Sequence, residues 1–325
     1  MNICILNVDN KNSESEISKF EPFANPTQWL LQHSTEHYYL TKCNYKRILN
    51  NLIKKDFALF INLCDGAKGE NRPGIEVVKF LEKRNIPFTG ANSKFYEPSR
   101  IQMKSACKQS GIPYPKGIII KSVSEIKEVS EKLNFPLIVK HYNSYNSVGL
   151  TKKSVVNNLI ELHTQAKIII SKYKAALIEE YIEGKEFTVL IAENYNNKKI
   201  PFVFEPLEIV FPKDEAFKHF NLKWKKHSAM KYTPVVNNNI SNKLKKYSSK
   251  MFINMNGSGY ARSDIRMNNK GEIFMLEINP NCSVYFPKNN PSSADEILYN
   301  QKNGHEIFTE LIIKSALYKK LQNNR

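Results

Sequence analysis

Short apolar runs and amphipathic stretches alternate along the first part of the chain. The apolar runs of strand type are residues 2–8, 58–64 and 86–92, and a helical pattern covers residues 74–85. The last of these strands closes on Gly90, next to turn-forming residues. This alternation of strand and helix predicts a small parallel α/β domain over residues 1–95.

A second, smaller α+β domain is predicted over residues 96–182. A helix begins near Pro98 and ends at Gly111, because the prolines that follow cannot continue it. We then expect strands at residues 117–121, 136–140 and 175–182, with helices at 123–134 and between 150 and 175. A polar loop that ends at Gly149 follows the second of these strands.

The third predicted domain, residues 183–325, contains a hairpin. Strands are expected at residues 187–193, 199–211, 260–267 and 272–279, with helices near 240–256 and at 306–321. The last two strands are joined by Asn268–Gly271, which is a good hairpin turn. The predicted fold is therefore a three-domain protein of α/β and α+β class.

The composition is that of an ordinary folded protein. Hydrophobic residues make up 41% and charged residues 24% of the 325 residues, which argues against a disordered or collagen-like chain. No apolar run reaches the length of a membrane span, and the first residues lack signal-peptide features, so we expect a cytoplasmic protein. The five cysteines include no C-x-x-C pair and are expected to be reduced thiols.

The net charge of +17 raises the question of a nucleic-acid partner. The basic residues are mostly lysines and are spread along the whole chain, mixed with many asparagines. A dedicated nucleic-acid site needs a basic patch or a recognition motif, which this distribution does not provide. We therefore expect a solvated basic surface that also attracts nucleotide phosphates.

The hairpin carries the most informative polar residues. Arg262 and Asp264 are two apart on one strand, and Glu277 and Asn279 are two apart on the other, so each pair points to one face. Two carboxylates and an amide oxygen are ligands that Mg²⁺ prefers, and an arginine beside them can stabilise developing negative charge. The alternative is a surface hairpin, which is weakened because Leu276 and Ile278 are expected to face a core.

Two further groups are weak signals in isolation. Lys104 lies on the predicted helix, and Lys140 ends an apolar strand before a loop whose backbone N–H groups could cover phosphates. Either lysine alone is more simply a solvated terminus. A crossover between two strands carries Glu179, Glu180, Tyr181, Ile182 and Glu186, which could contact adenine and ribose or form a solvated polar connection.

The order of these motifs resembles the ATP-grasp superfamily, and in particular the D-alanine–D-alanine ligase family, from about residue 62 to 291. The resemblance implies a nucleotide site between the central and C-terminal domains, with ATP and two Mg²⁺ ions, or Mn²⁺, as cofactors. It implies phosphate contacts from Lys104, Lys140, Ser147 and Gly149, and nucleotide contacts from Glu179, Glu180, Tyr181, Ile182 and Glu186. It also implies metal ligation by Asp264, Glu277 and Asn279, with catalytic roles for Arg262 and for Lys223 in a mobile loop.

The chain departs from the family pattern on the amino-acid side. The phosphate-covering loop has Ser144, Tyr145 and Asn146 in place of the usual residues, and no residue of the segment after the first strand can be assigned a role. Ser283 and Lys288 fall near the acceptor-binding positions, and Trp224 replaces a tyrosine after the loop lysine. Lys288, if it faced the pocket, would suit an acidic acceptor.

The resemblance implies an ATP-dependent carboxylate–amine ligase that joins small amino acids or peptides through an acyl phosphate. The altered acceptor residues leave the product open, because buried polar groups of a pocket set such discrimination. The alternative is a non-catalytic ATP-binding regulator or scaffold of the same fold, which would not need Arg262 together with all three metal ligands. The expected partners are small molecules and, as among the relatives, a second copy in a homodimer; no membrane partner is expected.

Overall fold

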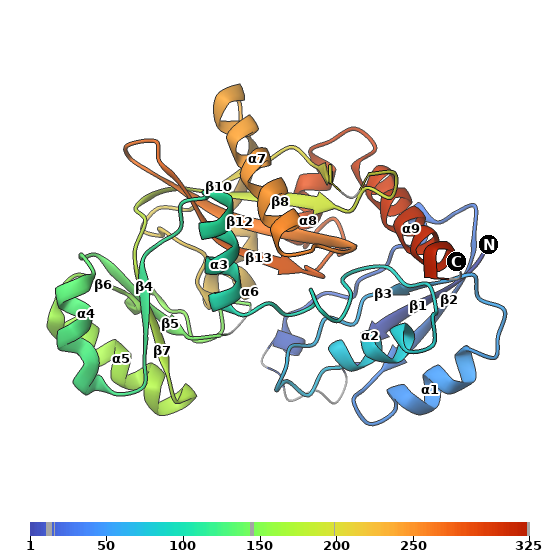
Figure 1. Ribbon diagram of the computed structural model, residues 1–325, viewed down its shortest axis with the longest axis horizontal. Coiled ribbons are helices and arrows are strands. Elements are labelled where there is room, and N and C mark those ends of the chain that lie inside the picture. The colour runs from blue at the N-terminus through green and yellow to red at the C-terminus, as the bar shows by residue number, and fades with distance from the viewer. Residues whose placement is uncertain (11–14, 16, 144–145, 198, 324–325) are drawn as a thin grey trace.

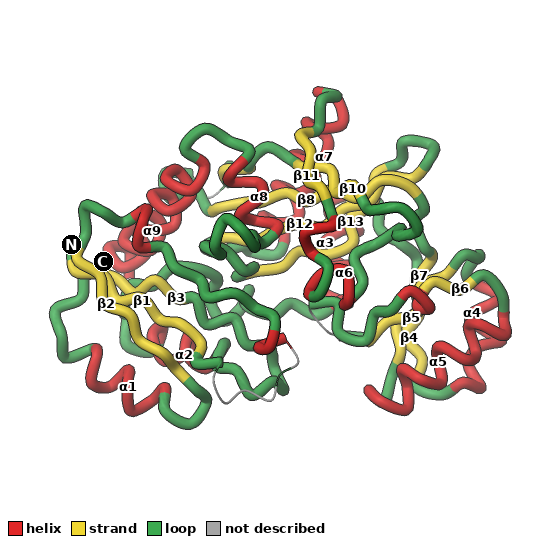
Figure 2. The backbone as a smooth tube through the Cα atoms, turned by 180° about the vertical axis from the view of Figure 1, so that it is seen from behind, coloured by secondary structure: helices red, strands yellow, loops and turns green. Residues whose placement is uncertain are grey.

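Three β-sheets organise the protein into three units along its longest axis (Figure 1). The structure is a computed structural model that describes residues 1–10, 15, 17–143, 146–197 and 199–323. The large sheet lies between two smaller ones, and the view from behind shows the same order (Figure 2). Short 3-10 helices occur at Ile17–Lys19, Thr27–Trp29, Val123–Glu125, Lys152–Ser154 and His227–Ala229.

The N-terminal sheet is parallel, as predicted. Its strands, in the order β2-β1-β3, are β1 (Asn2–Val8), β2 (Ser34–Leu40) and β3 (Leu59–Asn62), with helices α1 (Tyr45–Leu52) and α2 (Ile75–Glu82). Edge strand β2 was not predicted, because its residues are mostly polar or half-exposed. The strand expected at 86–92 is reduced to a bridge between Phe60 and Phe88, since Pro87 cannot donate to a ladder.

The central unit is a four-stranded antiparallel sheet with helices on one face. Its strands, in the order β4-β7-β5-β6, are β4 (Gly117–Ile120), β5 (Leu137–His141), β6 (Val155–Val156) and β7 (Ala176–Glu180). Helices α4 (Ile126–Lys132) and α5 (Leu159–Tyr173) pack on this sheet through Val129, Leu162 and Ile178. The other face of this sheet carries polar side chains and lies on the side of the large sheet.

The large sheet is antiparallel and contains the predicted hairpin. Its strands are β8 (Gly184–Ala192), β9 (Phe202–Val203), β10 (Leu207–Val210), β11 (Lys231–Pro234), β12 (Tyr260–Asn268) and β13 (Ile273–Pro280). The order is β11-β10-β8-β12-β13, with β9 paired to β8. The hairpin β12–β13 forms as predicted, whereas β11 was not foreseen within a polar stretch.

Helices cover the two faces of the large sheet differently. On one face, α3 (Arg100–Ser110) and α7 (Asn238–Asn254) pack on β8 residues Val189 and Ile191. On the other face, α8 (Ser293–Tyr299) and α9 (Gly304–Asn323) cover only the end of β8 that carries Leu190 and Ala192. Because side chains alternate along a strand, the uncovered part of this second face presents Glu186 and Thr188, and it borders the site described below.

Helices α3 and α9 tie the units together. Helix α3 begins with a capping box at Ser99 and ends at Gly111, whose φ of 63° is easily adopted by glycine. Met103 of α3 packs into the core of the large sheet, so the predicted central domain, residues 96–182, contains a helix that packs on the sheet of the predicted third domain. Helix α9 packs Ile313 and Ala316 against Ile3 and Ile5 of the N-terminal sheet (Figure 1). Among the described residues, no helix is long and apolar enough to cross a membrane.

Candidate active site

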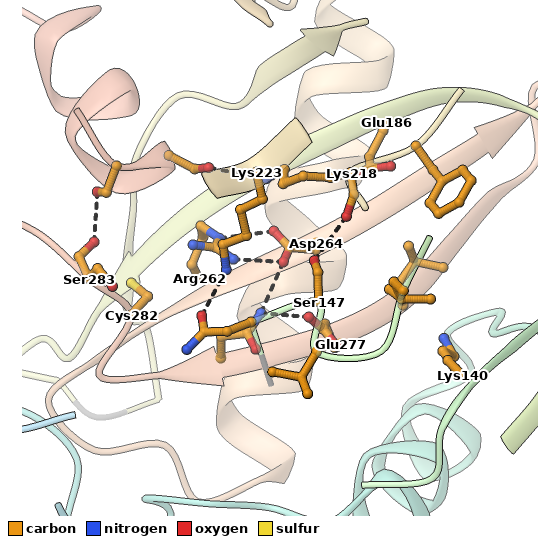
Figure 3. A pocket seen from close by; sticks show the side chains of 18 of the residues that line it. Lys140, Ser147, Glu186, Lys218, Lys223, Arg262, Asp264, Glu277, Cys282 and Ser283 are labelled. Atoms are coloured by element: carbon orange, nitrogen blue, oxygen red, sulfur yellow. Dashed lines mark hydrogen bonds and ion pairs between the residues drawn. The ribbon is translucent and has the colours of Figure 1, made fainter. Parts of the chain in front are cut away.

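The hairpin brings its four polar residues together on one face. Arg262 is the register partner of Asn279, and Asp264 is the partner of Glu277. All four side chains line one large cavity between the sheets, with the Arg262 and Asp264 side chains almost fully buried (Figure 3). The grouping predicted from strand alternation is therefore present in the structure.

A β-bulge changes the surroundings of this group. The pairing of β12 with β13 shifts between Asp264 and Ile265, so Leu276 has no partner opposite. Ile278 and Met275 pack in the core, but Leu276 lines the cavity beside Glu277. The prediction that Leu276 faces a core is wrong, because the extra residue of a bulge interrupts the alternation of side chains.

The guanidinium group of Arg262 and the amide of Asn279 donate hydrogen bonds to the two hairpin carboxylates. Arg262 donates from Nε and Nη2 to the two oxygens of Asp264, at 2.9 and 2.8 Å. Asn279 donates from Nδ2 to Asp264 at 3.0 Å and to Glu277 at 3.2 Å. Burial opposes ionisation of Asp264, but the charge and hydrogen bonds of Arg262, together with the charges of Lys218 and Lys223, outweigh burial and lower the pKa of Asp264.

This donor set fits a magnesium ion that is shared with a nucleotide. Asp264 and Glu277 converge on the Asn279 amide, and turning that amide would place its oxygen beside theirs as a third hard ligand. Within the described part of the chain, no group of three or more His, Cys, Asp or Glu residues could hold a metal ion. A cation at the hairpin would complete its coordination with oxygens of water or phosphate.

The two predicted phosphate lysines meet on one carboxylate. Lys104 of α3 lies 2.8 Å from Glu179 of β7, and Lys140 of β5 forms an ion pair with the other oxygen of the same carboxylate. Burial opposes ionisation of Glu179, but the two lysines outweigh it and lower its pKa to about 2. The alternative that both lysines are merely solvated strand or helix ends is therefore wrong.

The crossover from β7 to β8 lines the same cavity. Glu180, Tyr181 and Ile182 are lining residues, and the Tyr181 backbone N–H already donates to Pro136 O. Glu186, which is buried, lies 3.0 Å from Nη1 of Arg266. Burial raises the pKa of Glu186, although the charge of Arg266 acts against the rise.

Two loops close over the cavity and contact each other. Lys223 of α6 (Phe220–Trp224) donates from Nζ to the Asn146 side-chain oxygen at 2.8 Å, and the Trp224 ring N–H donates to the Asn146 carbonyl at 3.1 Å. Ser147 donates to the Lys218 carbonyl at 2.9 Å. Burial, with the charges of Arg262 and Lys218, lowers the pKa of Lys223 to about 7. The charges of Asp264 and Glu277 act against this shift but do not outweigh it.

The remaining predicted residues are divided between the cavity and the surface. Ser283 and Trp224 line the cavity, and Gly149, with a φ of 79°, lies between the lining residues Val148 and Leu150. Lys288 is exposed, is not among the lining residues, and lies 6.0 Å from the ring centroid of Tyr299. The structure thus does not bring Lys288 to the site. Ser144 and Tyr145 lie outside the described residues.

Three lysine and arginine residues that line the cavity were missed by sequence reasoning. Arg100 pairs with Glu277, Lys218 lies in the closing loop, and Arg266 pairs with Glu186. Arg266 could have been found, because it lies two residues after Asp264 on the same strand and shares its face. Arg100 and Lys218 carry no comparable signal, since they come from a helix start and a loop.

Comparisons with known proteins identify the relatives of the chain. The family model described as the D-ala D-ala ligase C-terminus matches residues 107–284, which is more than half of the chain. An uncharacterized protein y4sG of Sinorhizobium fredii is 30% identical over 68% of this chain, but the aligned part covers only 64% of that relative, a little under two thirds. The D-alanine–D-alanine ligase of Enterococcus faecalis is 29% identical over 72% of this chain and 67% of its own length.

A solved structure shows the same fold over almost the whole length. The D-alanine–D-alanine ligase of Bacillus anthracis, complexed with ATP, matches with a TM-score of 0.69 and 20% identity over 99% of both chains. That structure supports the three-domain ATP-grasp architecture expected from the motifs. With the match to the family model, it places this chain in the D-alanine–D-alanine ligase family of ATP-grasp proteins.

Proposed function

We propose that the protein is an ATP-dependent ligase that joins a carboxylate to an amine, with small amino acids or peptides as substrates. The observation that carries this proposal is the meeting of Arg262, Asp264, Glu277 and Asn279 on the wall of one cavity that Lys140 and Lys223 also line. A site that only bound a nucleotide would not need an arginine buried beside the metal ligands. The names of the relatives, which include D-alanine–D-alanine ligases, point to the same chemistry.

The nucleotide would lie between the central sheet and the large sheet. Glu179 positions Lys104 and Lys140. Both ammonium groups would also attract the phosphates of the nucleotide. The crossover residues Tyr181 and Ile182 line the cavity and would contact an adenine ring, and Glu186 would accept from ribose hydroxyls. The Arg266 ion pair holds the Glu186 carboxylate in place for that role.

Magnesium would be held by Asp264, Glu277 and Asn279, for which the converging oxygens and amide fit. When bound, the metal ions neutralise charge on the β and γ phosphates. Arg100 forms an ion pair with Glu277, and Arg262 forms one with Asp264. Binding of metal ions to these carboxylates would weaken both ion pairs. Arg262 would then be free to interact with the reacting groups.

The reaction would pass through an acyl phosphate. An oxygen of the substrate carboxylate attacks the γ phosphorus and the bond to the β-phosphate oxygen breaks, so ADP leaves; Lys223 would stabilise the transferring group. The amine of the second substrate then attacks the acyl carbon. Arg262 would stabilise the oxyanion of the tetrahedral species before phosphate leaves and the amide remains.

Closure of the two loops would keep water away from the acyl phosphate. The contacts of Asn146 with Lys223 and Trp224, and of Ser147 with the Lys218 carbonyl, join the loops directly over the cavity. Water that reached the acyl phosphate would hydrolyse it and waste ATP. Loop contact is therefore part of the proposed mechanism and not only of the fold.

The test is phosphate release from Mg-ATP with single and paired D- and L-amino acids, together with mass spectrometry of the products. We expect one pair to stimulate release and to give a condensed product whose mass is the sum of the pair minus water. The Asp264→Ala variant should lose both signals. ATP binding with no stimulated release by any amino acid or dipeptide would contradict the proposal and favour a nucleotide-binding regulator.

A further inference from the structure

A second, smaller pocket adjoins the large cavity on the side of the N-terminal unit. It is lined by side chains of the first strand and the segments that follow β1 and β3, and it shares Asp65, Asn281, Cys282 and Ser283 with the large cavity. A substrate bound near Arg262 could therefore extend into the small pocket past Asn281. Of the site residues predicted from the sequence, Ser283 alone lines the small pocket as far as the described residues show.

Several buried polar atoms of this pocket lack a hydrogen-bond partner among the described residues. The acceptor atoms without a hydrogen bond are Asn10 Oδ1 and Glu21 Oε1, although the two side chains also hydrogen-bond to each other. The donor atoms without a hydrogen bond are Asn62 Nδ2, Asn281 Nδ2, and Nε and Nη1 of Arg72, of which Nη1 lies 3.6 Å from Glu70. Arg72 and Asn62 are each only 1% exposed. A buried polar atom without a partner costs free energy, so water or a bound group must supply the missing hydrogen bonds of this pocket.

The orientation of the two amides is set by the backbone. Asn62 Oδ1 accepts from the Cys64 backbone N–H at 3.2 Å, and Asn281 Oδ1 accepts from the Ala91 backbone N–H at 2.7 Å. Each Nδ2 group is thus left as a donor, because a flipped amide would lose its backbone bond. The pocket consequently offers donors and acceptors at the same time.

The charges of the pocket argue against a charged guest. The Arg72 guanidinium pairs with Glu21 at 2.8 Å and with Asp65, and Glu70 lies 3.6 Å from it. An anion would meet these carboxylates, and burial with the charge of Asp65 already raises the pKa of Glu21. A cation would leave the donors of Asn62, Asn281 and Arg72 unpaired. An apolar group would leave every polar atom unpaired.

We propose that the small pocket binds an amide group of the substrate, whose N–H bonds to Glu21 and Asn10 while its C=O accepts from both Asn62 and Asn281. This inference rests on the proposed ligase function and narrows its substrate class. The carboxylate substrate is then either an amino acid with a carboxamide side chain or a short peptide whose peptide bond enters the pocket. Both sources present the same neutral group with one donor side and one acceptor side.

The experiment measures binding by isothermal titration calorimetry, without nucleotide and with a non-hydrolysable ATP analogue and Mg²⁺. The probes are D- and L-glutamine and asparagine, the dipeptides alanyl-alanine and glycyl-glycine, and three near-isosteres of glutamine: glutamate, 2,4-diaminobutyrate and norvaline. We expect an amide probe to bind about 10- to 100-fold more tightly than its anionic, cationic and apolar counterparts. Tightest binding by a carboxamide or by a dipeptide identifies the source of the amide.

The Asn62→Asp variant tests the pocket itself. Aspartate keeps the oxygen that accepts from Cys64 but replaces the donor, so the preference for amides should fall about 10-fold. Asn92→Asp is the matched control, because its Oδ1 also accepts from backbone N–H groups but it lines neither the large cavity nor the small pocket. Thermal unfolding of both variants checks that they remain folded.

Two results would overturn the inference. The first is that the unmodified protein binds glutamate, diaminobutyrate or norvaline as tightly as the amide probes or more tightly. If folded Asn62→Asp kept the full preference for amides, the proposed hydrogen bond from Asn62 to the amide C=O would be refuted. Binding is measured without turnover, so failure of the ligase proposal, seen as absent phosphate release, is distinguishable from failure of this one.

Discussion

The large cavity and the small pocket beside it differ in how their buried charges are paired. In the cavity, Glu179 has two lysines, Asp264 has Arg262, and Glu186 has Arg266. In the small pocket, polar atoms of Arg72 and Glu21 are left without partners among the described residues. In the first region each of these carboxylates is paired with a cation, although Nε of Arg266 has no hydrogen-bond partner among the described residues. In the second region the Nδ2 groups of Asn62 and Asn281 also lack such partners, and a neutral guest would complete their hydrogen bonds.

This difference teaches where specificity and chemistry reside. Ion pairs that exist before ATP binds hold the catalytic groups in place. When ATP binds, these groups would exchange their protein partners for the phosphates. Unpaired polar atoms discriminate between substrates, because a wrong substrate leaves them unsatisfied. Mutations in the cavity should therefore change turnover or stability strongly, and mutations in the small pocket should change substrate preference.

The largest effect is expected from Asp264→Asn. The variant loses a carboxylate that would hold Mg²⁺ and leaves Arg262 without its ion-pair partner. We expect product formation to fall by about 10³-fold in steady-state assays with Mg-ATP. Asp214→Asn, on the exposed part of the closing loop, is the control and should retain activity. Activity of Asp264→Asn close to that of the unmodified protein would refute the metal assignment.

The next effect is expected from Glu179→Gln. Removal of this buried carboxylate leaves the charges of Lys104 and Lys140 close together and unpaired, which should lower the free energy of unfolding by about 3 kcal/mol. Urea unfolding measures the loss, and added ATP should restore part of it because phosphates replace the missing anion. Glu180→Gln is the matched control, since Glu180 accepts only long bonds from Asn134.

The Glu179 pair also predicts a dependence of stability on pH. The pKa of Glu179 is lowered from 4.5 to about 2 in the folded protein, so its stabilisation is present above pH 4.5 and is lost as the pH falls towards 2. Glu179→Gln should flatten the unfolding curve in this window. An identical pH dependence in both proteins would contradict the pairing.

A smaller effect is expected for Lys223. Its pKa of about 7 means that the amine is protonated below pH 7 and neutral above it, and only the protonated form attracts phosphate. The affinity for ATP should therefore weaken several-fold as the pH rises from 6 to 8, as measured by calorimetry. Lys223→Met should remove this dependence, whereas Lys225→Met, on the exposed side of the same loop, should keep it.

The smallest effect is expected for Lys288. Its exposed side chain does not line the cavity, so Lys288→Ala should leave the rate with every acceptor within about twofold of the unmodified protein. A rate assay with acidic and neutral acceptors measures this. A selective loss with acidic acceptors would restore the idea that Lys288 reaches the site.

The sequence predicted the hairpin site well because two local rules determine it. A four-residue turn fixes the register of β12 and β13, and alternation then places Arg262, Asp264, Glu277 and Asn279 on one face. The bulge at Leu276 was not predictable, since it depends on the fit of the strand to its neighbours. Edge strands β2 and β11 were missed because their polar residues give a weak strand pattern.

The small pocket could not have been predicted from sequence. Arg72 and Glu21 are 51 positions apart, and Asn281 comes from the end of β13, so only the packing of the N-terminal unit against the large sheet brings them together. No motif connects these residues. Ion pairs such as Lys104 with Glu179 were equally hidden, although each residue had been singled out separately.

The most direct test of the ligase account is transfer of an oxygen label. The carboxylate substrate identified by phosphate release is prepared with ¹⁸O in its carboxyl group and turned over with Mg-ATP, and the released phosphate is analysed by mass spectrometry. The account predicts one ¹⁸O atom in each phosphate, because the carboxylate oxygen remains on phosphorus when the amine displaces phosphate. Formation of ADP and unlabelled phosphate would show that water, and not the substrate carboxylate, attacks ATP, which would contradict the acyl-phosphate mechanism.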